Sequence, residues 1–428
     1  MLNIQLLLTG NELMSGDIVD SNSAMIAQSL AKIGLAVKRK VAVSDDINDL
    51  IEEINAISIK ADVLIVNGGL GPTVDDLTAE ALAQVADVQI TQHPEALTHI
   101  TQWCERRNFK LNAPNLKQTM LPDGCDIVPN HLGSAVGFHL RLNNCDIYCT
   151  PGVPKELQLM LDKELTPSIE SLLPEKSHHH VSRYQVFGIG ESSLQKLVDE
   201  KIDNWPESVE LGFRASMPLL ELKLTSKSEK AKAEKAACYE QLKALLGDHI
   251  VAQIDEVPLT FGDHLQALLR EQGKKITFAE SCTGGMLASS MTRVAGSSAV
   301  FDGSFVSYAN DQKQAMLGVN EQTLAQYGAV SEQTVQEMAQ GALAKTGADI
   351  VVAVSGIAGP GGGSDDKPVG TVWLAWGTSQ SIQTVCLHIP ANRYYFQHYV
   401  TAIGLDLARR LLLASEETPR YITERQKS

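Results

Sequence analysis

The sequence predicts an α/β protein, with an α/β domain at each end and a smaller α+β unit between them. In both terminal parts of the chain, short apolar runs alternate with amphipathic helical patterns. Such alternation is typical of parallel, doubly wound sheets. With 428 residues, the chain also exceeds what a single hydrophobic core usually organises. Three domains are therefore expected.

The first domain is expected over residues 1–173. Its predicted strands and helices alternate in the order 4–8, 22–34, 62–66, 75–86 and 146–150. The segment 173–181 is polar and holds a proline and three histidines. Three histidines can bind a metal ion, but a solvated linker is the simpler interpretation.

The middle unit is expected over 182–253 and the second α/β domain over 257–420. A charged helix predicted at 227–246 carries glutamate–lysine pairs that suit a solvated face. In the last domain the predicted strands are 275–280, 303–309, 349–356 and 370–377, and the predicted helices are 262–272, 284–294, 330–347 and one through 406–413.

Charge and cysteine content narrow the classes of function. Lysine and arginine number 36 against 51 acidic residues, and 36 − 51 = −15, which argues against nucleic acid or an anionic membrane as the main partner. The seven cysteines form no CxxC pair, which favours reduced thiols in a cytoplasm over zinc ligands. The amino terminus lacks a basic region before its short apolar run, so no signal peptide is expected.

The stretch AESCTGGM, residues 279–286, places a serine, a cysteine and a threonine before two glycines. It follows a predicted strand and opens a predicted helix, where backbone N–H groups favour an anion or a developing oxyanion. A tight turn that requires small residues explains the pattern equally well. This stretch alone does not identify a nucleophile.

A second cluster holds Ser298, Tyr308 and Lys313, spaced by ten and five residues. A serine becomes nucleophilic when a base takes its proton, and a lysine with a lowered pKa can be that base, with a tyrosine hydroxyl as its partner. A surface lysine and a core tyrosine would give the same pattern.

A third candidate is the loop VNGGLGPTVDDLT, residues 66–78, between a predicted strand and a predicted helix. Its glycines allow close backbone approach, and adjacent carboxylates suit a phosphate bridged through a divalent metal ion. Paired aspartates at a helix start are also good N-caps. The residues of this candidate site are Gly68, Gly69, Gly71, Thr73, Asp75 and Asp76.

Many motifs of the last domain occur together and in order. They are residues 281–285, 296–298, Tyr308, Lys313, VSGIAGPGGG at 354–363 and KPVGTVWLA at 367–375. Together they resemble the carboxy-terminal domain of the CinA (competence/damage-inducible) family, whose activity is nicotinamide-nucleotide amidase. The resemblance implies hydrolysis of nicotinamide mononucleotide to nicotinate mononucleotide and ammonia, in pyridine nucleotide salvage and without a cofactor.

The same resemblance assigns roles to residues. It implies Ser298 as nucleophile, Lys313 as general base and Tyr308 as the partner of that base. The residues that it implies for the substrate and oxyanion pocket are Ser281, Cys282, Thr283, Gly284, Ser355 and Gly356. Ser355 stands where relatives usually carry threonine, and it keeps the hydroxyl. Arg393 is the candidate ligand of the substrate phosphate, although an ordinary surface arginine would fit the sequence nearly as well.

The amino-terminal motifs at 9–23, 66–78, 130–137 and 150–157 resemble the first domain of the same family, which is related to molybdopterin-binding proteins. The resemblance implies hydrolysis of ADP-ribose to AMP and ribose 5-phosphate, with cobalt, manganese or magnesium at Asp75 and Asp76, with or without potassium. Asn11 and the segment 130–137 depart from the usual pattern, which weakens this activity more than the fold. GIGES at 188–192 resembles the entry of a KH-like domain.

The sequence thus predicts a cytoplasmic homodimer that acts on small-molecule nucleotides, with neither nucleic acid nor membrane as a partner. An alternative is an amidase whose amino-terminal domain is a non-catalytic pterin- or nucleotide-binding module. A pterin-binding adaptor without either activity is a further alternative.

Overall fold

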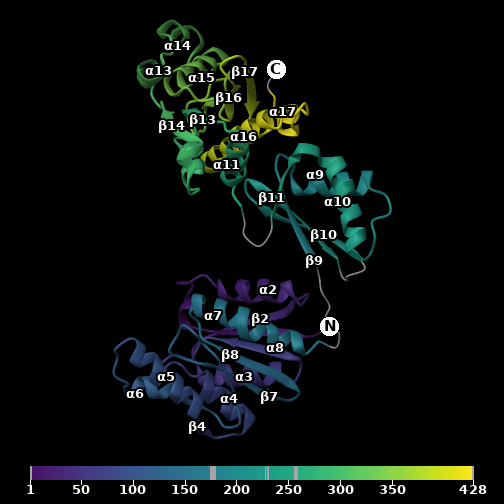
Figure 1. The fold of residues 1–428 in the computed structure, drawn as a ribbon, viewed down its shortest axis with the longest axis vertical. Coiled ribbons are helices and arrows are strands. Elements are labelled where there is room, and N and C mark those ends of the chain that lie inside the picture. The colour runs from purple at the N-terminus through teal and green to yellow at the C-terminus, as the bar shows by residue number, and fades with distance from the viewer. Residues whose placement is uncertain (1, 174–179, 227, 229–230, 255–258, 427–428) are drawn as a thin grey trace. The chain divides into compact units, whose positions relative to one another are not determined.

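The computed structural model describes residues 2–173, 180–226, 228, 231–254 and 259–426. Apart from a short segment near residue 228, these residues form two compact units that divide between His180 and Val181 (Figure 1). Of the three histidines expected in a linker, His178 and His179 lie outside the described residues, whereas His180 begins the strand β9 (His180–Val186).

Unit 1 is built on a six-stranded sheet of order β2-β1-β3-β8-β7-β6. Its strands are β1 (Ile4–Thr9), β2 (Val37–Val43), β3 (Val63–Asn67), β6 (Asp126–Val128), β7 (Gly137–Leu142) and β8 (Cys145–Thr150). Side chains alternate across a strand, so Leu6 joins one buried cluster with Ile26, and Leu7 joins another with Leu50. Helices therefore cover both faces of the sheet (Figure 1).

The helices of unit 1 fall into those two layers and a peripheral lobe. They are α1 (Asn11–Ser15), α2 (Asn22–Lys32), α3 (Ile47–Ser58), α4 (Thr78–Ala86), α5 (Pro94–Arg106), α6 (Ala113–Lys117), α7 (Pro154–Met160) and α8 (Thr166–Ser171). The short strands β4 (Ile90–Gln92) and β5 (Met120–Pro122) pair with each other. This pairing holds α6 beside the start of α4.

The sheet of unit 1, for which the alternation of strands and helices predicted parallel strands, is mixed. β1, β2, β3 and β8 are parallel, but β7 and β6 are antiparallel additions. Asn143 and Asn144 join β7 to β8 with φ values of 52° and 65°. A two-residue turn with both φ values positive favours asparagine and joins antiparallel strands. The helix predicted at 75–86 begins only at Thr78, so Asp75 and Asp76 belong to the loop.

The middle domain is a four-stranded sheet of order β10-β11-β9-β12 with two helices. Besides β9, its elements are α9 (Glu191–Lys201), β10 (Val209–Ser216), β11 (Leu219–Ser226), α10 (Lys232–Leu246) and β12 (Ile250–Ile254). Of the helix predicted at 227–246, residues Lys232–Leu246 form α10, and residues 227, 229 and 230 lie outside the described residues. This helix is solvated on one side, as expected, and packs Cys238 and Leu242 into the core of this domain.

The carboxy-terminal domain has a five-stranded sheet of order β14-β13-β15-β16-β17. The strands are β13 (Ile276–Glu280), β14 (Phe301–Val306), β15 (Ile350–Gly356), β16 (Thr371–Gly377) and β17 (Ile382–His388). The helices are α11 (Phe261–Glu271), α12 (Met286–Thr292), α13 (Asn310–Leu317), α14 (Glu321–Tyr327), α15 (Glu332–Thr346), α16 (Arg393–Leu412) and α17 (Arg420–Arg425).

This second sheet is also mixed, because β16 and β17 run antiparallel to their neighbours. Val351 packs with Met338 of α15, whereas Val352 packs with Ile403 of α16, so the two helices cover opposite faces. The structure adds β17, α13, α14 and α17 to the predicted elements, and α16 is longer than predicted. None of the helices among the described residues combines the length and apolar character that a membrane span requires.

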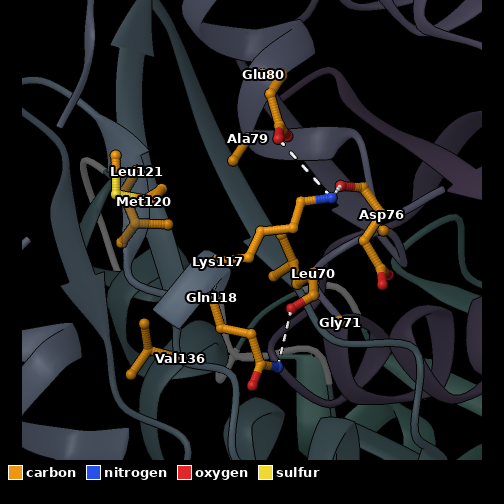
Figure 2. A pocket seen from close by; sticks show the side chains of 11 residues that line it. Leu70, Gly71, Asp76, Ala79, Glu80, Lys117, Gln118, Met120, Leu121 and Val136 are labelled. Atoms are coloured by element: carbon orange, nitrogen blue, oxygen red, sulfur yellow. Dashed lines mark hydrogen bonds and ion pairs between the residues drawn. The ribbon is translucent and has the colours of Figure 1, made fainter. Parts of the chain in front are cut away.

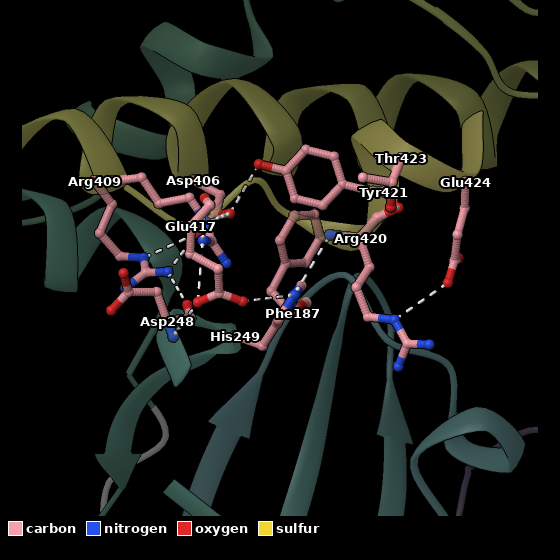
Figure 3. Close-up of polar contacts among 11 residues, drawn as sticks. Phe187, Asp248, His249, Asp406, Arg409, Glu417, Arg420, Tyr421, Thr423 and Glu424 are labelled. Atoms are coloured by element: carbon pink, nitrogen blue, oxygen red, sulfur yellow. Dashed lines mark hydrogen bonds and ion pairs between the residues drawn. The ribbon is translucent and has the colours of Figure 1, made fainter. Parts of the chain in front are cut away.

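A buried charge cluster joins the middle domain to α16 (Figure 3). Asp406 is fully buried and accepts hydrogen bonds from Arg409 Nε at 2.9 Å, Arg410 Nε at 2.8 Å and the Tyr421 hydroxyl at 2.9 Å. Arg409 also donates to the backbone carbonyl of Asp248 in the middle domain. Buried charges persist only when they are paired and hydrogen-bonded. The two domains therefore pack as one compact unit.

Candidate active site

Three neighbouring strands of the carboxy-terminal sheet end at one edge. β14, β13 and β15 are adjacent and parallel. Ser281 follows β13, Tyr308 comes two residues after β14, and Ser355 lies near the end of β15. In open sheets with parallel strands, ligands bind beyond the carboxyl ends. The predicted pocket residues therefore meet at this edge.

Lys313 and Ser281 are in direct contact there. The Lys313 Nζ donates hydrogen bonds to Ser281 Oγ at 3.0 Å and to the carbonyl oxygen of Ser307 at 2.7 Å. Lys313 is 1% exposed and Ser281 is 8% exposed. A fully buried lysine with no carboxylate among its hydrogen-bond partners is unusual, because burial disfavours its charged form.

Burial also sets the proton affinity of this lysine. It lowers the pKa of Lys313 from 10.5 to about 8, because the ammonium loses its hydration. A neutral amine within hydrogen-bond distance of a serine hydroxyl can accept its proton and activate the oxygen as a nucleophile. The pair is therefore a candidate for nucleophilic catalysis.

The helix that follows Ser281 is capped by Glu280, which sequence reasoning missed. Its fully buried carboxylate accepts hydrogen bonds from the backbone N–H groups of Gly285 at 3.0 Å, Leu287 at 3.0 Å and Ala288 at 2.9 Å. The start of α12 is thus occupied by an internal anion. Among the described residues, the N–H groups of Cys282 and Thr283 donate to no backbone carbonyl. The sequence signal that could have indicated Glu280 was an acidic residue at the end of an apolar strand.

Cys282 is buried beside the pair and is a poor nucleophile. Burial raises the pKa of its thiol from 9.0 to about 12, so almost no thiolate forms at neutral pH. Thr283 is 1% exposed, and its hydroxyl donates to Glu280 at 2.8 Å. Of the consecutive serine, cysteine and threonine, only the serine contacts a base.

Ser281 and Lys313 line a cavity of about 210 Å³. The residues that line it are Ser281, Cys282, Tyr308, Lys313, Ala329, Val330, Ser355, Gly356, Ala358 and Arg393. Arg393 donates to the Tyr308 hydroxyl at 2.7 Å and to the carbonyl oxygen of Gly359 at 3.0 Å. Ser355 donates to the carbonyl oxygen of Ala329 at 2.7 Å. Ala329 and Val330 carried no sequence signal for this site.

Ser298, the predicted nucleophile, lies elsewhere. It is exposed in a short 3₁₀ turn, Ser297–Ala299, and it does not line the cavity. Its neighbours in sequence connect α12 to β14, at the opposite end of β14 from Tyr308. The structure thus brings Lys313 together with Ser281 and separates it from Ser298. Tyr308 contributes its backbone carbonyl, 3.4 Å from Lys313 Nζ, while its hydroxyl contacts Arg393.

In unit 1 the glycine loop lies between β3 and α4. Gly69 has a φ of +67°, and an added Cβ would lie 2.3 Å from the Thr78 hydroxyl, so only glycine fits there. Asp76 Oδ2 accepts from the backbone N–H of Thr73 at 2.8 Å and from its hydroxyl at 2.5 Å. Asp75 is exposed. The two aspartates therefore differ in their surroundings: the Asp76 carboxylate stabilises the loop through hydrogen bonds, whereas the Asp75 side chain faces solvent.

A small cavity of about 20 Å³ lies beside this loop (Figure 2). It has room for about one water molecule. The predicted residues Gly69, Gly71 and Asp76 line it, together with Glu80, Lys117 and Gln118, which sequence reasoning missed. Among the described residues, no group of three or more histidine, cysteine, aspartate or glutamate side chains is placed to hold a metal ion. The divalent metal ion expected at Asp75 and Asp76 therefore stays a prediction.

Comparison with known proteins covers the whole chain. Residues 5–171 match the family described as probable molybdopterin binding domain, 182–252 match the damage-inducible protein CinA KH domain, and 260–412 match the CinA C-terminal domain. A CinA-like protein of Colwellia psychrerythraea is 54% identical over 99% of this chain and 98% of its own length. One of Shewanella sediminis is 39% identical over 96% of each chain.

Solved structures match parts of the chain. The crystal structure of a competence/damage-inducible protein from Agrobacterium tumefaciens is 39% identical, with a TM-score of 0.35, and covers 37% of this chain and 99% of that chain.

The fold and the matches define a class of three-domain proteins, in which a KH-like domain lies between a molybdopterin-binding-like domain and a CinA carboxy-terminal domain. The chain belongs to the CinA family. The predicted fold class, with its KH-like middle domain, is thereby confirmed.

Proposed function

We propose that the carboxy-terminal domain hydrolyses the carboxamide of nicotinamide mononucleotide to nicotinate mononucleotide and ammonia. The observation that carries the proposal is the buried contact between Lys313 Nζ and Ser281 Oγ at 3.0 Å, at the wall of a cavity that also holds Arg393. The family resemblance of the sequence motifs supplies the substrate. The geometry supplies a nucleophile different from the one that the motif spacing suggested.

In the first half of the reaction, neutral Lys313 takes the proton of Ser281 as Oγ attacks the carboxamide carbon. The negative charge moves to the carbonyl oxygen, for which the N–H groups of Cys282 and Thr283 are the proposed donors. Protonated Lys313 then gives its proton to the amide nitrogen, the C–N bond breaks, and ammonia leaves. The product of this half is an ester between Ser281 and the nicotinoyl group.

In the second half of the reaction, a water molecule hydrolyses the ester. Neutral Lys313 takes a proton from the water, whose oxygen attacks the ester carbon. The bond to Ser281 Oγ breaks, and the serine regains a proton from Lys313. The sum is one amide and one water converted to one carboxylate and ammonium, with no redox change. No step requires a metal ion.

Arg393 is the proposed ligand of the substrate phosphate. Its guanidinium lines the cavity and is held by neutral oxygen acceptors, the Tyr308 hydroxyl and the Gly359 carbonyl. None of these partners cancels its charge, so it remains attractive to a phosphate dianion. This feature favours a phosphorylated substrate over the free amide.

Ammonia release from nicotinamide mononucleotide by the purified full-length chain, with the Ser281→Ala variant as the blank, tests this function. Release that requires Ser281 is the expected result. A wild-type chain that releases no ammonia from this substrate would refute the proposed amidase.

A second candidate function concerns unit 1, because its glycine loop is followed by a helix and lined by a lysine. We propose that this loop binds the pyrophosphate of a nucleotide such as ADP-ribose and hydrolyses it to AMP and ribose 5-phosphate. The alternative is a module that binds a nucleotide or pterin without cleaving it. An assay of AMP release from ADP-ribose by the full chain distinguishes the two, since only hydrolysis yields AMP.

A further inference from the structure

A lysine that no motif indicated reaches the glycine loop of unit 1. Lys117 ends the short helix α6, and its Nζ donates to the carbonyl oxygens of Thr73 at 2.6 Å and Asp76 at 2.7 Å. Its Nζ also lies 3.8 Å from Glu80 Oε1 on α4 (Figure 2). One ammonium thus contacts oxygen atoms from both ends of the segment 73–76 and from the helix that follows.

The third N–H of this ammonium is available to a ligand. A lysine ammonium has three N–H donors, and two of them are used by Thr73 and Asp76. The remaining neighbour, Glu80, is beyond hydrogen-bond distance. The Lys117 side chain is 27% exposed and lines the small cavity beside Gly69 and Gly71, so an anionic oxygen can approach it from solvent.

The neighbouring residue supports a ligand site at the same place. Gln118 is only 8% exposed, and its Nε2 donates to the carbonyl oxygen of Leu70 at 3.2 Å. Its Oε1 is buried and has no partner among the described residues. A buried acceptor without a partner is costly. Since Gln118 lines the cavity, a water molecule that donates one O–H to Gln118 Oε1 and the other to an anionic ligand would satisfy it.

We propose that Lys117 is the built-in cation of this loop and takes the place that a divalent metal ion would otherwise have. The ammonium lies against the two carboxylate-bearing residues of the cavity, Asp76 and Glu80, and a second cation placed a few ångströms away would be repelled by it. A phosphate oxygen would instead meet the free N–H of Lys117 and the backbone of the glycine loop. Binding of a pyrophosphate at this loop then needs no divalent metal ion. This inference rests on the proposed nucleotide binding by unit 1.

Calorimetric titration of the full chain with inorganic pyrophosphate, in excess EDTA and then with Mn²⁺, tests the inference. We expect the wild-type chain to bind in EDTA. Lys117→Met, which removes the charge and keeps the length, should weaken binding in EDTA at least about tenfold. Lys117→Arg should stay within about threefold. Lys110→Met, an exposed lysine of the same lobe, is the matched control and should bind like the wild type.

Two outcomes would overturn the inference while leaving nucleotide binding by unit 1 intact. One is wild-type binding only when Mn²⁺ is present, and the other is undiminished binding by Lys117→Met in EDTA. A wild-type chain that binds pyrophosphate under neither condition would reject the proposed function of the loop as well. Thermal unfolding without ligand reports that unit 1 of each variant is folded, and a melting temperature that rises with pyrophosphate in the wild type but not in Lys117→Met is the second measurement.

Discussion

Lys313 Nζ contacts Ser281 Oγ at 3.0 Å inside the wall of the carboxy-terminal cavity, although 32 residues separate them in sequence. The contact exists because β13 and β14 are parallel neighbours, so the turn after one strand faces the helix after the other. Neither residue is accessible enough to be explained as a surface group. The order of the strands therefore places the proposed nucleophile beside the proposed base.

The first prediction concerns the nucleophile. Ser281→Ala should reduce kcat for ammonia release by at least about 10³-fold, because it removes the oxygen that would carry the acyl group. Ser298→Ala should stay within about threefold of the wild type, because Ser298 is exposed and outside the cavity. Steady-state kinetics of both variants decide between them. The reverse pattern would return the role to Ser298.

The second prediction concerns pH. The proposed base must be neutral, and the pKa of Lys313 is lowered to about 8, so kcat/KM should rise about tenfold between pH 7 and pH 9 and then level off. Lys313→Met should lose at least about 10²-fold in kcat at every pH. Lys345→Met, an exposed lysine of the same domain, is the control. A wild-type profile that is flat through pH 8 would contradict this assignment.

The same shift predicts a change in stability. The unfolded chain keeps the Lys313 proton up to about pH 10.5, whereas the folded chain releases it near pH 8. Between these values the unfolded state binds more protons, so this group makes the free energy of unfolding rise with pH. Denaturant titrations of unit 2 at pH 7.5 and pH 10 measure the difference. In Lys313→Met, the free energy of unfolding should lack this rise between pH 7.5 and pH 10. A rise equal to that of the wild type would count against a buried, neutral Lys313.

The fourth prediction separates binding from chemistry at the cavity mouth. Arg393→Met should raise KM for nicotinamide mononucleotide at least about tenfold, because the phosphate loses a charged partner, while kcat stays within about threefold. Tyr308→Phe should change KM modestly, since the hydroxyl contacts Arg393 and not Lys313 Nζ. If Tyr308→Phe instead lowered kcat by 10²-fold with KM unchanged, tyrosine would be acting on the base as the sequence suggested.

The fifth prediction tests the cluster between the middle domain and α16. Asp406→Asn leaves the buried guanidinium groups of Arg409 and Arg410 without their carboxylate, and this should cost about 3–5 kcal/mol in the free energy of unfolding of unit 2. Asp302→Asn breaks an exposed pair with Lys275 and should cost less than about 1 kcal/mol. Guanidinium denaturation compares the two. Equal losses would mean that the cluster does not hold the domains together.

Patterns of residues close together in the chain predicted many of the strands and helices. Apolar alternation located most strands of the terminal domains, and glycine-rich turns after β3 and β13 marked where candidate sites lie, because these signals depend on residues close in the chain. The direction of β7 was also readable, since Asn143 and Asn144 favour a tight hairpin turn. The helices α13 and α14 were not predicted, because their short patterns resemble loops until they pack on the sheet.

What the sequence by itself determined about this protein is its set of domains, its family and the residue types at two candidate sites. Only the tertiary structure decided which serine meets Lys313, how Asp75 differs from Asp76, that Glu280 caps the start of α12 and that Lys117 contacts the glycine loop. The physical reason is that a pKa, a hydrogen bond and a cavity depend on neighbours in space. Those neighbours are fixed by strand order and helix packing, which residue spacing does not encode.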